Sequence, residues 1–237
     1  SFYFPKGMTS DGTNLYVADT SNHRIRKIVI ATRVVSTLAG SGTQGSEDGT
    51  GPGAEFDGPK GITINGNNLY VVDTDNHKIR KIVISTGEVS TLAGTGNSGF
   101  LDSTTGTQAK FKEPYGITTD GTNLYVTDTD NYKIRKIVIS TGEVTTFVGS
   151  TNGYANGLGT AAQFSKIKGI TTDGTNLYVA DRTNNRIRKI VIATRVVSTL
   201  AGSGTQGSDD GTGIAASFKK PMGITIYGNS LYVAERY

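Results

Sequence analysis

Short alternating runs of hydrophobic and polar residues recur along this chain in the same order five times. Each recurrence begins with Gly-Ile-Thr or Gly-Met-Thr, continues through Asn/Ser-Leu-Tyr-Val and reaches an acidic residue. The glycines that open the copies are Gly7, Gly61, Gly116, Gly169 and Gly223, at intervals of 54, 55, 53 and 54 residues. A fixed period of this length predicts a stack of similar supersecondary units.

The third copy shows what one unit contains. Short runs rich in β-branched and aromatic residues predict strands at 116–119, 124–127, 133–139 and 144–148. Turn-forming residues separate these runs, including Asp120-Gly121, a pair that favours tight hairpins because glycine accepts a positive φ. No helix of ordinary length fits between them, so the unit is predicted to be a four-stranded antiparallel meander.

A single meander has two faces to bury and too little core of its own. Radial repetition solves this problem, because each sheet then packs against its neighbours around an axis. The prediction is an all-β fold, a β-propeller of four-stranded antiparallel blades with about 54 residues per repeat. Residues 1–237 would form a single propeller segment with four full repeats and a half repeat. The expected repeats cover about 4–56, 57–111, 112–164 and 165–218, with a partial repeat at 219–237.

Glycine-rich crossovers of about twenty residues join the predicted units. A phenylalanine near the end of each crossover is expected to anchor it on the next blade, since apolar residues at repeat phase usually belong to the core. These residues are Phe4, Phe56, Phe111, Phe164 and Phe218. Two blades are nearly copies of each other, because residues 24–46 and 186–208 are identical. We infer a recent duplication with little separate specialisation of these two blades.

Four and a half units leave one blade with an unpaired edge strand, which a closed ring would not have. We therefore expect a segment of a longer propeller, or self-association through the open blade edge. The chain starts with Ser1 rather than Met, which favours a processed or excised segment.

Composition adds little that narrows the function. The chain has no cysteine, so it holds no disulfide or thiolate metal ligand, and no apolar run approaches the length needed to cross a bilayer. The net charge is +4 and the isoelectric point is near 9.1, which is mildly basic. Basic residues recur once per repeat rather than in blocks, which makes a nucleic-acid partner less favoured than another protein.

The second copy carries a recognisable signature. Pro59-Lys60-Gly61-Ile62-Thr63 leads to Asn68-Leu69-Tyr70-Val71-Val72-Asp73, and Asn76-His77-Lys78-Ile79-Arg80 follows. This pattern resembles the NHL repeat of bacterial type, and it recurs in register along the whole chain. The third and fourth copies depart from it, with Asn131-Tyr132 and Asn184-Asn185 in place of Asn-His. The resemblance implies a β-propeller, most often six-bladed, that acts as a binding platform within a larger protein.

An acidic residue ends the second strand of each repeat, and a basic triplet occupies the third. Asp caps turns and pairs with Arg, so we interpret both positions as structural, with the arginines between blades and paired with the acidic position next door. The alternatives are a ring of carboxylates that binds cations, and arginines that line a rim and bind RNA, as in some animal members of the family. The structural positions are Asp19, Asp73, Asp128, Asp181, Arg26, Arg80, Arg135 and Arg188.

No catalytic, cofactor or metal site is predicted. The G-x-G-x-x-G runs, such as Gly40–Gly45, lack the helix that a dinucleotide fingerprint needs. His23 and His77 occupy equivalent positions, but two histidines without a third ligand do not make a zinc or copper site.

The sequence therefore favours a non-enzymatic binding propeller whose partner is a protein or a surface polymer, with an exported or cell-surface setting by family analogy. The alternatives are an RNA-binding NHL propeller and a metal-dependent lyase or lactonase-like enzyme. Residues that break the repeat pattern are the candidates for a binding surface, because loops on a rigid scaffold carry recognition. They are Phe100, Tyr115, Tyr154, Arg182, Met222 and Tyr227.

Overall fold

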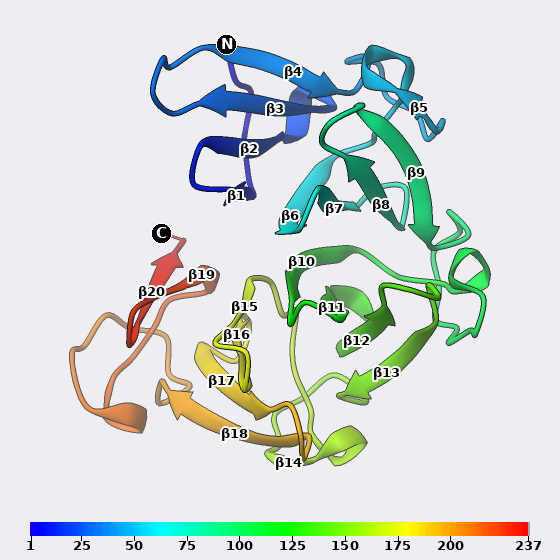
Figure 1. The fold of residues 1–237 in the computed structure, drawn as a ribbon. Coiled ribbons are helices and arrows are strands. Elements are labelled where there is room, and N and C mark those ends of the chain that lie inside the picture. The colour runs from blue at the N-terminus through cyan, green and yellow to red at the C-terminus, as the bar shows by residue number, and fades with distance from the viewer. Residues whose placement is uncertain (237) are drawn as a thin grey trace.

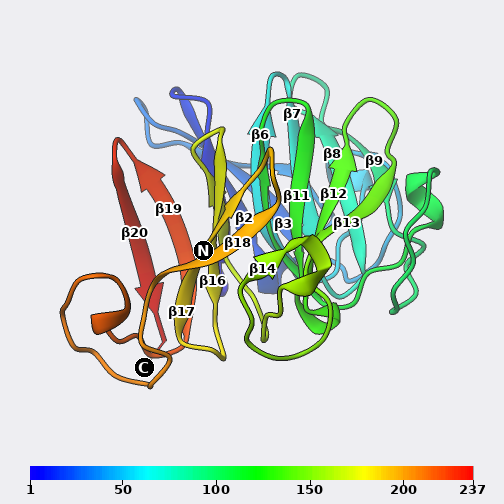
Figure 2. The same ribbon diagram turned by 90° about the horizontal axis from the view of Figure 1, so that it is seen from below.

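A computed structural model describes residues 1–236 and confirms the predicted all-β propeller. Four antiparallel sheets and a two-stranded half sheet stand around a common axis, in chain order (Figure 1). Seen from the side, the strands run roughly along that axis (Figure 2). Within residues 1–236, no helix has the length and apolar character needed to cross a membrane.

Each blade begins with the strand nearest the axis and moves outward. Blade 1 contains β1 (Met8–Ser10), β2 (Asn14–Asp19), β3 (Arg24–Val29) and β4 (Val35–Ala39). Blade 2 contains β6 (Pro59–Asn65), β7 (Asn68–Asp73), β8 (Lys78–Val83) and β9 (Glu88–Ala93). Blade 3 contains β10 (Pro114–Thr119), β11 (Asn123–Asp128), β12 (Lys133–Val138) and β13 (Val144–Val148). Blade 4 contains β15 (Ile170–Thr172), β16 (Asn176–Asp181), β17 (Arg186–Val191) and β18 (Val196–Ala201). The half blade 5 contains β19 (Pro221–Tyr227) and β20 (Ser230–Glu235).

The crossovers are more ordered than their glycine content suggests. Two of them add a fifth strand to the outside of the following blade, β5 (Gly49–Thr50) on blade 2 and β14 (Gly157–Leu158) on blade 4. Short 3₁₀ turns occur in the crossovers and after some second strands. They are η1 (Thr20–Asn22), η2 (Gly51–Gly53), η3 (Gly106–Gln108), η4 (Thr129–Asn131), η5 (Gly159–Ala161) and η6 (Gly213–Ala215).

The core is divided into layers between consecutive blades. One apolar cluster joins Tyr16 and Ile25 of blade 1 to Leu69 and Ile82 of blade 2. Equivalent clusters join blade 2 to blade 3 and blade 3 to blade 4. Because each layer needs the facing blade, the blades depend on one another for burial of their apolar surface.

The innermost strands approach one another so closely that they require glycine. A Cβ atom added at Gly61 would lie 2.4 Å from the carbonyl oxygen of Tyr115, and one at Gly116 would lie 2.5 Å from that of Lys168. Contacts below 3 Å cannot be accommodated without movement of the backbone. The recurring glycine is therefore explained by close packing around the axis rather than by an unusual dihedral angle.

One phenylalanine assignment was wrong. Phe56, Phe111 and Phe164 are fully buried, as expected for anchors, but Phe4 is 62% exposed. In blade 1 the equivalent residue is Phe2, whose ring lies 5.4 Å from the Arg26 guanidinium, as Phe56 lies 5.2 Å from that of Arg80. Phe2 lies five residues before Gly7, the same spacing as Phe56 has to Gly61, so Phe4 is two residues out of phase with the repeat.

Gly116→Ala should destabilise the protein by about 1–3 kcal/mol, because the new methyl group overpacks the contact between β10 and β15. Gly223→Ala is the matched control at the same repeat position. There the nearest atom to an added Cβ is the Ala234 Cβ at 3.5 Å, an ordinary contact. Urea denaturation followed by circular dichroism measures both, and equal losses for the two variants would contradict the explanation.

Candidate functional site

The inner strands enclose a central cavity of about 490 Å³. Its walls are the strand segments around the recurring glycines, so much of the lining is backbone. Antiparallel order places the start of each inner strand at the same end of the axis as the crossovers and the turns between second and third strands. The residue just before each glycine therefore surrounds one mouth of the cavity.

The residues at this mouth are mostly cationic. The five equivalent positions are Lys6, Lys60, Tyr115, Lys168 and Met222. All of them except Lys168 line the cavity. Lys168 lies against Tyr115, with its ammonium 4.3 Å from the centre of the Tyr115 ring. The Lys60 ammonium lies 5.9 Å from the same ring. Tyr115 thus holds two cations near each other through its π face. We call this group the cationic mouth.

Burial shapes the electrostatics of the cationic mouth. Burial lowers the pKa of Lys168 to about 8, and the nearby charges of Lys60 and Arg182 act in the same direction. Burial also raises the pKa of Tyr115, so its hydroxyl stays neutral near pH 7. The side chain of Lys168 therefore carries a positive charge in a position where water screens it poorly, which an anionic ligand would relieve.

Two nearby carboxylates are paired with other lysines, although the charges of Asp130 and Glu113 still oppose the lowering of the Lys168 pKa. Lys60 lies 3.4 Å from Asp75, and Lys166 lies 2.7 Å from Asp130. Among residues 1–236, no carboxylate lies within ion-pair distance of Lys168. The cationic mouth therefore has a surplus of positive charge and can bind an anion such as a carboxylate or a phosphate.

Three of the six candidate surface residues converge on this site. Tyr115 and Met222 line the cavity, and the charge of Arg182 acts on both Tyr115 and Lys168. Tyr227 does not join them, because it lies 79% exposed at the β19–β20 turn, at the opposite end of the inner strand. Lys168 was missed by sequence reasoning, although the recurrence of lysine before the glycine of three copies was a usable signal.

Phe100 and Tyr154 have a different environment from the cationic mouth. The Arg135 guanidinium lies 4.9 Å from the centre of the Phe100 ring. It also lies 5.1 Å from the centre of the Phe111 ring. The Tyr154 ring lies 5.0 Å from the Arg188 guanidinium and 3.7 Å from that of the half-buried Arg186. Both aromatic residues are partly exposed and pack on arginines that belong to the blades. Their contacts give them a role in covering these arginines.

The acidic and arginine repeat positions meet inside each blade, so the expected pairing between blades was wrong. In blade 2, Arg80 is fully buried and donates hydrogen bonds to Asp73 at 2.8 Å and to Asp48 at 2.7 Å. It also donates to the backbone carbonyls of Glu55 and Glu47, both at 2.9 Å. Arg80 thus binds the aspartate of its own blade, and the other three acceptors come from the crossover that precedes the blade.

Blades 3 and 4 repeat this arrangement, which we call the arginine cluster. Arg135 binds Asp128, Asp102 and two crossover carbonyls, and Arg188 binds Asp181, Asn156 and two crossover carbonyls. In blade 1, Arg26 contacts Asp19 at 3.2 Å and the carbonyl of Ser36, with no crossover group as acceptor within residues 1–236.

Burial raises the pKa of Asp73 to about 6, and the charge of Arg80 is the largest influence that opposes this rise.

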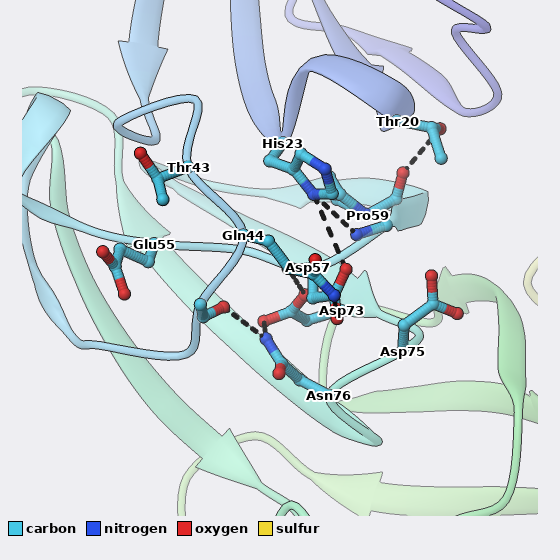
Figure 3. Close-up of polar contacts among 12 residues, drawn as sticks. Thr20, His23, Thr43, Gln44, Glu55, Asp57, Pro59, Asp73, Asp75 and Asn76 are labelled. Carbon is cyan, nitrogen blue, oxygen red and sulfur yellow. Dashed lines mark hydrogen bonds and ion pairs between the residues drawn. The ribbon is translucent and has the colours of Figure 1, made fainter.

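His23 serves the junction between blades 1 and 2 (Figure 3), whereas the buried Nδ1 of His77 has no hydrogen-bond partner among residues 1–236. His23 has a left-handed backbone and accepts a hydrogen bond at Nδ1 from the backbone N–H of Gly58, at 3.2 Å. Asn185 uses its side-chain oxygen in the same way for the N–H of Lys220. Asn76 donates to Asp73 and to the carbonyl of Gly45 in the same figure. No group of three or more His, Cys, Asp or Glu side chains suitable for a metal ion occurs in the described part of the chain.

The model of the NHL repeat family matches residues 2–28 and 56–82, which are the first two copies up to the third strand. The chain is 30% identical to Protein SUPPRESSOR OF QUENCHING 1, chloroplastic, of Arabidopsis thaliana, over 99% of this chain and 24% of that protein. It is 28% identical to NHL repeat-containing protein 2 of Gallus gallus, over 99% of this chain and 38% of that protein. The chain belongs to the NHL-repeat family. It spans less than two fifths of the length of these relatives.

Solved structures share the fold of this chain. An auxiliary nutrient binding protein from Bacteroides thetaiotaomicron has a TM-score of 0.70 at 17% identity, covering 94% of this chain and 54% of that one. A chain of a nidogen/laminin complex has a TM-score of 0.69 at 17% identity, covering 98% of this chain and 72% of that one. At these identities, the likeness to both structures concerns the fold alone.

The arginine cluster generates a prediction for this NHL propeller. Arg135→Lys should destabilise the protein by about 2–3 kcal/mol, because an ammonium cannot reach two acidic side chains and two carbonyls together. Arg26→Lys should cost less than about 1 kcal/mol, since Arg26 has only Asp19 and one carbonyl to satisfy. Chemical denaturation of both variants measures the difference. A loss for Arg26→Lys as large as that for Arg135→Lys would show that the crossover contacts contribute nothing.

Proposed function

We propose that this NHL propeller is a non-enzymatic binding module that recognises anionic groups of a protein or a surface polymer at its cationic mouth. The observation that carries the proposal is Lys168, a half-buried cation that lies on Tyr115 and has no carboxylate within ion-pair distance among residues 1–236. Partial burial of a charge without a partner is costly, and an anionic ligand offsets that cost.

The cavity can accept a ligand group that projects into it, such as an acidic side chain or a sugar acid, whereas a partner with a flat surface could not enter it. Its volume of about 490 Å³ is typical of small-ligand pockets, and the polar groups converge at one mouth. The names of the two solved neighbours, a nutrient binding protein and a component of a nidogen/laminin complex, are consistent with a binding role for propellers of this shape. A bacterial, exported or cell-surface setting remains a prediction from the repeat type.

The RNA-binding alternative loses its strongest candidates in the structure. The arginines Arg80, Arg135 and Arg188 are fully buried in the arginine clusters and cannot reach a phosphate. The lactonase-like or lyase-like alternative would need a metal held by several inward ligands. Elemental analysis of the purified protein tests it, and stoichiometric calcium, zinc or copper would contradict a non-enzymatic role.

Lys168→Met should weaken binding of poly-L-glutamate and alginate by about tenfold, since a charge-assisted contact contributes roughly 1.4 kcal/mol or more. Lys189→Met is the matched control, because it removes one positive charge from the outer part of β17. Fluorescence anisotropy with labelled polymers measures both. Equal affinity of the two variants, or binding of a labelled oligouridine that is stronger than that of both polymers, would overturn the proposal.

Polymer binding should weaken several-fold as the pH rises from about 7 to 9, because Lys168 loses its proton near pH 8 while exposed lysines remain charged. Affinity falls rather than rises with pH because only the protonated form of Lys168 is positively charged and attracts an anion. Lys168→Met should show a nearly flat profile over the same range. Parallel profiles for the wild-type protein and the variant would show that another group controls the dependence.

A further inference from the structure

One buried polar residue breaks the repeat pattern beside the cationic mouth. Thr127 is the residue before the last in β11, at a position where every other copy has alanine or valine. The equivalent residues are Ala18, Val72, Ala180 and Ala234. Because Thr127 is fully buried, its hydroxyl has to find hydrogen-bond partners inside the protein.

The hydroxyl of Thr127 connects two blades. Its Oγ1 accepts a hydrogen bond from the backbone N–H of Gly116 at 2.7 Å and donates one to the backbone carbonyl of Lys168 at 2.7 Å. The Gly116 carbonyl lies farther from Oγ1, at 3.4 Å, so the Lys168 carbonyl is the nearer acceptor. The N–H of Gly116 belongs to the peptide unit that follows Tyr115. One hydroxyl therefore links the backbones of Tyr115 and Lys168, whose side chains meet at the cationic mouth.

The next junction along the chain lacks such a hydroxyl and uses a direct contact. There the position of Thr127 is taken by Ala180, and the N–H of Gly169 donates straight to the carbonyl of Met222 at 2.8 Å. In blade 3, the Thr127 hydroxyl is inserted between the corresponding N–H and carbonyl, so two bonds take the place of one. The position of the Lys168 backbone is therefore set by a side chain of blade 3.

A second hydroxyl of blade 3 holds the residue before Lys168, but that contact belongs to the scaffold. Thr129 donates from Oγ1 to the carbonyl of Ile167 at 2.8 Å. Thr20 makes the equivalent bond from blade 1 to the carbonyl of Pro59 in blade 2, at 2.7 Å. Thr129 thus follows the repeat, whereas Thr127 is the contact by which the junction at Lys168 departs from it.

We infer that Thr127 is a positioning residue of the cationic mouth, whose hydroxyl fixes the backbone of Lys168 so that the Lys168 ammonium stays over the ring of Tyr115. The inference rests on the proposed function, because it names what holds the anion-binding group in place before a ligand arrives. A lysine side chain has many rotamers, and ordering it costs free energy on binding. Fixing the backbone at its root and placing its ammonium on an aromatic face lowers that cost.

Thr127→Val removes the hydroxyl with little change of shape, and valine is the residue that blade 2 has at this position. NMR spectra of the whole protein without ligand should report the contact, because the ring current of Tyr115 shifts the nearby ε-methylene protons of Lys168 upfield of those of other lysines. Lys168→Met assigns that signal by its disappearance. In Thr127→Val, the signal should lose at least half of its upfield displacement, whereas Thr127→Ser, which keeps the hydroxyl, should retain it.

The same variants connect positioning with binding. Thr127→Val should weaken the binding of poly-L-glutamate about three- to tenfold in fluorescence anisotropy, as expected for the loss of one neutral hydrogen bond. Thr127→Ser should bind nearly as well as the wild-type protein. Val89→Ala is the control for general destabilisation, because Val89 is buried on β9, the fourth strand of blade 2 from the axis. It should change neither the Lys168 signal nor the affinity.

An unchanged Lys168 signal in Thr127→Val would overturn the inference, whatever the affinity for the polymer. Equal changes of the signal in Thr127→Val and Val89→Ala would also overturn it, since the hydroxyl would then act only through stability. If the signal moves as expected but the wild-type protein binds neither poly-L-glutamate nor alginate, the positioning role of Thr127 is supported and the proposed function fails instead.

Discussion

The buried arginine on the third strand is the interaction on which the order of the blades depends. Arg80 joins the aspartate of its own blade to the crossover that arrives from the blade before it. A glycine-rich crossover has little apolar surface of its own, and its backbone carbonyls need partners when they are covered. The guanidinium supplies several donors in a fixed geometry, so a single side chain fixes the crossover onto the next blade.

Glycine at the axis and arginine farther out play complementary roles. The glycines let the inner strands approach until a Cβ would meet the backbone of the next blade, and the apolar layers then fill the space between the sheets. The arginine clusters set the position of each crossover relative to the sheet that follows. A buried ion pair by itself is weak evidence for stability, but here it selects one register between a repeat and its neighbour.

The blades and the pairing of Arg with Asp could be predicted from the sequence, because residues that recur at a fixed spacing occupy equivalent structural positions. The period, the hairpin turns and the alternation in residues 116–148 predict blades, and the pairing of Arg with Asp follows from their equal spacing in every copy. The partner of Asp48 and Asp102 was not predictable in the same way. These residues lie in crossovers of irregular length, and their contact with Arg80 and Arg135 depends on how the chain folds back. Lys168 was overlooked because lysine is common on surfaces, and only the fold shows that it lies on Tyr115 at the axis.

The repeats also provide an internal reference that distinguishes structural charges from functional ones. A charged group that equivalent partners satisfy in blades 2, 3 and 4 belongs to the scaffold, as with Asp73 and Arg80. A charged group that has no partner in a position where the other copies have one, or that lies against other charges of the same sign, retains the ability to bind something else. Lys168 is such a group at the axis, because it lies on Tyr115 and no carboxylate of residues 1–236 is within ion-pair distance of it. Comparison with the equivalent position in the other repeats, rather than the charge itself, therefore separates a cation of the scaffold from one that could hold a ligand.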